Sequence, residues 1–112
     1  MTFWSIDQVE VFRLMGTYYW LTADQKSALS WWTKSIDTAK KLNTPPELAR
    51  TYLEVAKRLG EPGSSIYTLS DLDINSYLTM AYNIFMKLNL EWDLAELEKV
   101  RSLKNKSNNY AI

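Results

Sequence analysis

The boundaries of one helix are marked so clearly that they constrain the fold more than any other feature of this chain. Residues 44–47, Thr-Pro-Pro-Glu, place a hydroxyl at the cap, a proline at the first helical position, where its missing N–H costs nothing, and a glutamate three residues later. Apolar residues then recur at helical spacing until Gly60 and Pro62, which are typical helix stops. The pattern predicts a helix that begins at Pro45 and ends before Gly60.

Similar signals predict two helices before this one. Residues 5–8, Ser-Ile-Asp-Gln, form a capping-box pattern ahead of the first, and residues 22–25, Thr-Ala-Asp-Gln, repeat that pattern ahead of the second. The second helix ends with Lys40 and Lys41, whose charges suit the negative end of a helix dipole. Both segments carry apolar residues at helical spacing.

The second half of the chain predicts a loop and two further helices. Residues 61–72 contain Pro, Gly and Ser without a clear period and predict the one sizeable loop. Asp71 or Asp73 caps the fourth helix, and a strongly charged fifth helix follows Asn89. Beyond Leu103 we expect the chain to fray. Since no segment shows sustained strand alternation, the predicted class is all-α, with antiparallel helices joined by short turns.

The residue inventory excludes most catalytic sites. The 112 residues, which we expect to form one domain (1–112), include no cysteine and no histidine. This excludes thiolate nucleophiles, Cys/His zinc sites, imidazole bases and Ser-His-Asp triads. Thirteen Lys and Arg balance thirteen Asp and Glu, so the positive field that nucleic-acid binding requires is missing. We therefore expect no enzyme activity, no cofactor and no nucleic-acid partner.

Two acidic stretches are candidate sites. Residues 71–75 begin like a calcium-binding loop, but Ser76 stands where glycine is needed and Tyr82 where a bidentate glutamate is needed, so helix capping explains the aspartates better. The second stretch is on the last helix and comprises the carboxylates Glu91, Asp93, Glu96 and Glu98, which could in principle act as acids or bases. Because they lie beside Lys99 and Arg101, a solvated helix face is the simpler interpretation. We expect neither metal binding nor catalysis at these positions.

No apolar run of about 18 residues occurs, and the amino terminus lacks a basic stretch ahead of an apolar segment. We expect a soluble, cytoplasmic protein without a membrane partner. Five Trp, seven Tyr and three Phe are many for a chain of this size. They require burial sites or a partner.

The first two predicted helices follow a repeat pattern. In a unit of about 34 residues that starts at Val9, the fourth, seventh, eighth, eleventh, twentieth, twenty-fourth and twenty-seventh places hold Phe12, Met15, Gly16, Tyr19, Ala28, Trp32 and Ser35. This pattern resembles the tetratricopeptide repeat, in which the small eighth residue lets the two helices approach closely. A second unit that starts at Ala49 matches when about six extra residues are allowed in the loop 61–72; its matching residues are Tyr52, Val55, Ala56, Leu59, Ile74, Leu78 and Ala81.

The resemblance implies a short right-handed solenoid of about five helices. Its parts are a first helix pair at 9–42, a second pair at 44–88 and a capping helix at 90–104. It implies a non-catalytic module that binds a protein or peptide partner. Residues 31–36 and 46–59 are also similar to repeats at the carboxy-terminal end of large bacterial signalling proteins. The alternative is therefore the carboxy-terminal regulatory segment of a nucleotide cyclase or a signalling ATPase.

The resemblance also implies a binding groove. In tetratricopeptide arrays the first helix of each pair lines the concave surface at places two, five, nine and twelve. The candidate binding residues at these places are Arg13, Thr17, Trp20, Arg50, Leu53 and Lys57, with Glu10 and Gly60 completing the set. Cations around Trp20 and Leu53 would suit an acidic peptide with an apolar anchor; the alternative is ordinary surface charges. Thr17 and Lys57 depart from the asparagine of members that clamp a terminal carboxylate, so that ligand is not transferred.

Two helix pairs and a cap fall short of the three or so repeats that such stacks usually need. Either the chain is part of a longer array, or two chains complete each other's core as a homodimer. Apolar residues of the first helix could serve this contact, namely Phe3, Trp4, Val11, Tyr18 and Leu21. Trp31 lies about 100° around its helix from Trp32, and either packs inside or faces a partner.

Overall fold

The computed structural model describes residues 5–110, and the side chains of residues 5–104. Within this part the chain forms five helices and no strand, which confirms the predicted all-α class. The helices are α1 (Ile6–Leu21), α2 (Gln25–Lys41), α3 (Pro45–Leu59), α4 (Ile74–Lys87) and α5 (Glu91–Tyr110). None of the described helices is both long enough and apolar enough to cross a membrane.

Most helix boundaries follow the local signals, and two do not. Helix α3 begins at Pro45 and ends at Leu59, as predicted. Helix α2 is capped by Asp24 rather than by Thr22: the Asp24 carboxylate accepts the Ser27 N–H at 3.1 Å. Helix α5 continues past Leu103, after which we predict fraying, as far as Tyr110. No glycine or proline follows Leu103 to stop that helix.

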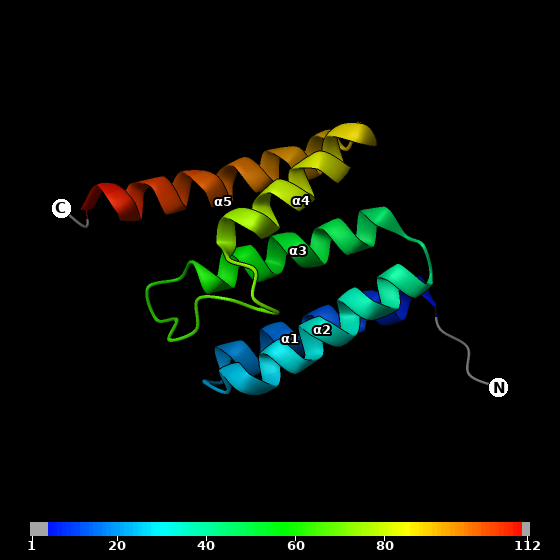
Figure 1. Cartoon of the computed structure of the whole chain (residues 1–112), viewed down its shortest axis with the longest axis horizontal. Coiled ribbons are helices and arrows are strands. Elements are labelled where there is room, and N and C mark those ends of the chain that lie inside the picture. Colours follow the sequence, from blue (N-terminus) through cyan, green and yellow to red (C-terminus); the bar gives the residue numbers. More distant parts are fainter. Residues whose placement is uncertain (1–4, 111–112) are drawn as a thin grey trace.

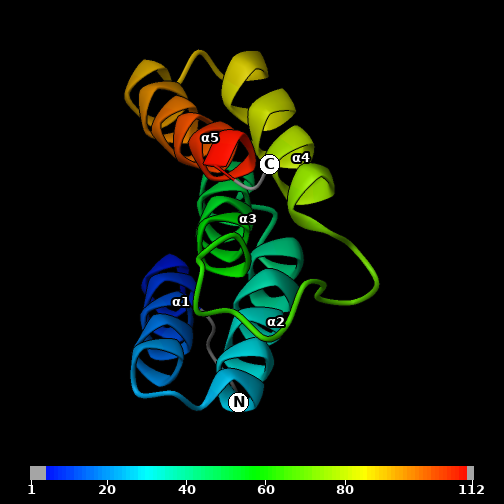
Figure 2. The same ribbon diagram turned by 90° about the vertical axis from the view of Figure 1, so that its left-hand side faces the viewer.

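The helices form two antiparallel pairs and a final single helix. Helix α1 packs against α2, α3 packs against α4, and α5 packs against α4. Figure 2 shows α1, α3 and α5 following one another along one side of the molecule, with α2 and α4 on the other side. Helix α3 contacts both α1 and α5, so these three helices share one face. The result is an elongated body of 54 × 34 × 22 Å (Figure 1).

The close approach of α1 to α2 depends on Gly16. A Cβ atom at Gly16 would lie 2.2 Å from Cδ1 of Trp32, closer than any real contact. Trp32 is fully buried, and its indole N–H donates to the Arg13 carbonyl at 3.2 Å. The small residue predicted at this place is therefore required by the packing of a tryptophan onto the backbone of α1.

The segment between α3 and α4 is folded back onto the first helix pair. The side chain of Gln25 donates to the Gly63 carbonyl at 3.2 Å and accepts the Ser65 N–H at 3.1 Å. Leu69 and Leu72 exchange backbone hydrogen bonds across a tight turn. The buried Tyr77 hydroxyl donates to the Leu69 carbonyl at 2.7 Å, which fixes this turn against α4.

The environment of Trp31 is intermediate between the two predicted for it, packing inside and facing a partner. Trp31 is half-buried, and its ring stacks on Tyr19 of α1 with 6.4 Å between the ring centroids. Phe12 lies 5.8 Å from it, and the Lys34 ammonium group lies over both rings. Phe3 and Trp4 lie outside the described residues.

Candidate functional site

A cavity of about 380 Å³ opens on the face that α1, α3 and α5 share. We call it the groove. Its lining comes from all three helices and comprises Arg13, Leu14, Thr17, Arg50, Leu53, Glu54, Lys57, Arg58, Trp92, Asp93, Glu96 and Val100. A volume of this order lies in the range of ligand pockets, which span roughly 300–1,000 Å³.

Five of the six candidate binding residues line this groove: Arg13, Thr17, Arg50, Leu53 and Lys57. Trp20 does not, and this corrects its predicted place. It is buried, its ring packs against Trp32 at 5.4 Å between centroids, and its indole N–H donates to Glu61 at 3.0 Å. Trp20 follows Gly16 by one helical turn and therefore shares the face of α1 that packs against α2.

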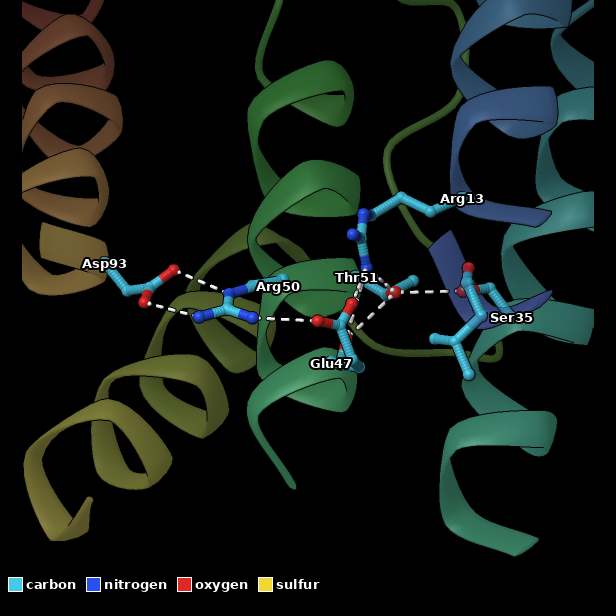
Figure 3. Close-up of polar contacts among 7 residues, drawn as sticks. Arg13, Ser35, Glu47, Arg50, Thr51 and Asp93 are labelled. Atoms are coloured by element: carbon cyan, nitrogen blue, oxygen red, sulfur yellow. Dashed lines mark hydrogen bonds and ion pairs between the residues drawn. The ribbon is translucent and has the colours of Figure 1, made fainter. Parts of the chain in front are cut away.

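An ion-pair chain joins the three helices that line the groove (Figure 3). Arg13 of α1 donates to the Glu47 carboxylate at 3.1 Å. Arg50 donates to the other Glu47 oxygen at 2.8 Å. Arg50 also holds Asp93 of α5 through two parallel hydrogen bonds of 2.9 and 3.0 Å, a bidentate geometry that fixes orientation as well as distance.

Two buried hydroxyls continue this chain into the first helix pair. The Ser35 hydroxyl donates to the Val9 carbonyl at 2.8 Å and lies 2.9 Å from the Thr51 hydroxyl oxygen. Arg13 donates to the same Thr51 oxygen at 3.2 Å. The Ser35 hydroxyl thus connects α2 to both α1 and α3 through buried hydrogen bonds.

A second polar chain links α1 to the end of α3. The Thr17 hydroxyl hydrogen bonds to Glu54, and Arg58 donates to the same carboxylate at 2.9 Å. Arg58 also pairs with Glu61 at 3.3 Å. Burial opposes the charged form of Arg58, but the hydrogen bonds and attraction of these two carboxylates outweigh it, so the pKa of Arg58 is raised.

Most of the groove's positive charge is therefore already neutralised. The hydrogen bond that Arg50 donates to Asp93 raises the pKa of its guanidinium above the ordinary value, although burial acts in the opposite direction. Lys57 differs, because it is exposed and forms no ion pair within residues 5–104. An anionic ligand that reached Arg13 or Arg50 would have to compete with Glu47 and Asp93.

Two exposed apolar side chains form opposite walls of the groove. Leu14 of α1 is 57% exposed and Trp92 of α5 is 71% exposed. Leu53 lies half-buried on α3 between them. The groove thus combines exposed apolar side chains with charged groups that, apart from Lys57, are paired within the chain. Such a combination is typical of sites that take an apolar anchor.

The contribution of α5 was missed in the sequence. Asp93 was expected on a solvated face, but it is 4% exposed and bonded to Arg50. The available signal was its spacing: Asp93 precedes Leu97 by four residues and Val100 by seven, so it shares their buried stripe. A carboxylate on such a stripe requires a cation from another element.

The side chains that line the groove offer hydrogen bonds, ion pairs and apolar contacts to a ligand. The chain has no histidine or cysteine to act as a base or nucleophile near neutral pH. Among the described residues, no group of carboxylates is arranged to hold a metal ion. The two aspartates of the candidate calcium-binding loop have different roles. Asp73 caps α4 by accepting the Ser76 N–H at 2.9 Å, and Asp71 lies in a turn with a φ of 64°.

The chain was compared with known proteins at three levels. No protein family, no curated protein and no solved structure matches it.

Proposed function

We propose that this chain is a non-catalytic protein-interaction module of the tetratricopeptide type, which binds a segment of a partner protein in the groove between α1, α3 and α5. The observation that carries the proposal is the pair of exposed apolar side chains, Leu14 of α1 and Trp92 of α5, that line a groove in which most charges are already paired. Large apolar side chains left in a concave site mark places where a partner is bound.

Two features of the helix arrangement support the tetratricopeptide part of the proposal. The first helices of the two pairs lie side by side on the face that carries the groove. Gly16 and Trp32, at the eighth and twenty-fourth places of the repeat, make the close contact that the pattern requires. In such arrays the shared face of the first helices is the surface used for ligands.

The groove also defines the chemistry of the ligand. An apolar side chain fits between Leu14 and Trp92 above Leu53, where it excludes water. One ligand carboxylate can pair with Lys57, which, unlike the three arginines of the groove lining, forms no ion pair within residues 5–104. We therefore propose a segment with an apolar anchor and a single acidic residue near it, in place of the broadly acidic peptide that the sequence alone indicates.

Selection from a phage-displayed library of random dodecapeptides tests this proposal. The immobilised chain is expected to enrich sequences with a large apolar residue and one Asp or Glu at a constant spacing. Affinities of the enriched peptides are then measured by titration against Trp92→Ala and Lys57→Glu. Each variant should weaken binding at least tenfold, because each removes one half of the proposed contact.

Matched controls separate the groove from the rest of the surface. Tyr67 is 70% exposed, nearly as much as Trp92, but lies in the loop away from the groove. Lys87, like Lys57, lies in the last turn of its helix. Tyr67→Ala and Lys87→Glu should bind the selected peptides with unchanged affinity. Enrichment of no common sequence, or equal losses in the control variants, would refute the groove as the binding site.

A further inference from the structure

Helix α1 is apolar on two opposite faces. Its inner face, with Val9, Gly16 and Trp20, is buried against the rest of the chain. Its outer face carries four large apolar side chains that are 51% to 65% exposed, which we call the outer stripe: Val11, Leu14, Tyr18 and Leu21. Figure 2 shows α1 at the edge of the molecule, with α2 and α3 on its inner sides. A helix that is apolar all round is normally covered on both faces.

The spacing of the outer stripe is symmetric along the helix. Successive members are three, four and three residues apart, so they form one continuous ridge. The midpoint falls at the level of residue 16. If a second α1 lies antiparallel across this midpoint, Val11 of each copy meets Leu21 of the other, and Leu14 meets Tyr18. Each smaller side chain thus faces a larger one.

Charge favours the antiparallel orientation over the parallel one. The exposed charged residues of α1 are Asp7 and Glu10, both acidic and both in its first half. Residues 14–21 carry no charge. Parallel packing would place the two acidic ends together, whereas antiparallel packing places each against the uncharged half of the other copy. Like charges in direct opposition would cost free energy in the first arrangement.

We propose that the outer stripe binds the outer stripe of a second copy of this chain, in an antiparallel contact with two-fold symmetry. Leu14 belongs to both surfaces, so a peptide in the groove and the second copy compete for this side chain. Because the contact rests on one helix from each copy, it is a small interface, and the dimer dissociates on dilution.

Disulfide cross-linking tests the orientation directly, since the chain has no cysteine of its own. Val11→Cys and Leu21→Cys chains are prepared separately and then mixed under mild oxidation. The antiparallel contact places residues 11 and 21 of different copies at the same level. It separates two copies of residue 11 by about 15 Å along the axis, beyond the reach of a disulfide. The mixture should form a covalent heterodimer, and neither variant alone should cross-link efficiently.

Light scattering after size-exclusion chromatography supplies the second measurement. The mass of the unmodified chain should rise towards that of a dimer with concentration, and Tyr18→Glu should remain a monomer with unchanged helical circular dichroism. Tyr67→Glu, which alters an equally exposed tyrosine outside α1, should dimerise normally. A monomer at all concentrations, cross-linking of Val11→Cys with itself, or equal effects of the two tyrosine variants would overturn the proposal. None of these outcomes decides whether the groove binds peptides.

Discussion

Substitution of Gly16 by alanine tests the packing that joins α1 to α2. The added Cβ would lie 2.2 Å from Cδ1 and 2.3 Å from Nε1 of Trp32. Trp32 is fully buried and cannot move aside freely. Overpacking of this kind costs about 3 kcal/mol, and displacement of the indole removes its bond to the Arg13 carbonyl, about 1 kcal/mol more. Alanine favours a helix over glycine by about 1 kcal/mol.

The expected net loss of unfolding free energy is therefore about 3 kcal/mol, which lowers the unfolding temperature by roughly 10 °C. Urea unfolding followed by circular dichroism measures it. Gly63→Ala is the control, since an added Cβ there meets nothing within 4 Å. In a Trp32→Phe background the smaller ring should reduce the cost of Gly16→Ala. Stabilisation by Gly16→Ala, as helix propensity alone predicts, would refute the close-packing argument.

Two further predictions concern buried polar groups. Asp93→Asn should reduce the unfolding free energy by about 1–2 kcal/mol, because Arg50 loses its bidentate partner while Glu47 still holds it. Urea unfolding measures this loss. A loss no greater than that caused by Glu98→Gln, which alters an exposed carboxylate, would contradict the prediction. Burial raises the pKa of Tyr77 from 10.0 to about 12, so the contribution of this neutral phenol is complete below pH 10 and declines as the pH rises towards 12. Tyr77→Phe should lack that decline in alkaline urea titrations, and parallel curves for the two proteins would disprove the assignment.

The helices were predictable because their signals are local. The adjacent residues Thr44 and Pro45 together mark the start of α3, and no tertiary contact is needed to interpret them. The start of α2 was misplaced because Thr22 and Asp24 are both good caps in one short stretch. The carboxylate that bonds the Ser27 N–H decides the boundary, and sequence alone does not rank the two.

The site was predictable only in part, because it depends on how separate helices are rotated against each other. The repeat pattern identified the groove-facing positions of α1 and α3, but it placed Trp20 there, although that ring packs against Trp32. The contribution of α5 to the groove was missed altogether. Arg50 and Asp93 are 43 residues apart in sequence, and no local signal connects them. Trp92 is exposed, so it is not part of the buried apolar stripe that a periodic sequence pattern reveals.

The most direct test of the groove uses the indole N–H signals of the tryptophans in an NMR titration with the best selected peptide. These tryptophans report on different places: Trp92 lies in the groove, Trp20 and Trp32 lie in the core, and Trp31 packs half-buried against Phe12 and Tyr19 of α1. The Trp92 signal, assigned through Trp92→Phe, should shift in proportion to binding while those of Trp20 and Trp32 stay in place. A shift at Trp31 with none at Trp92 would contradict the account.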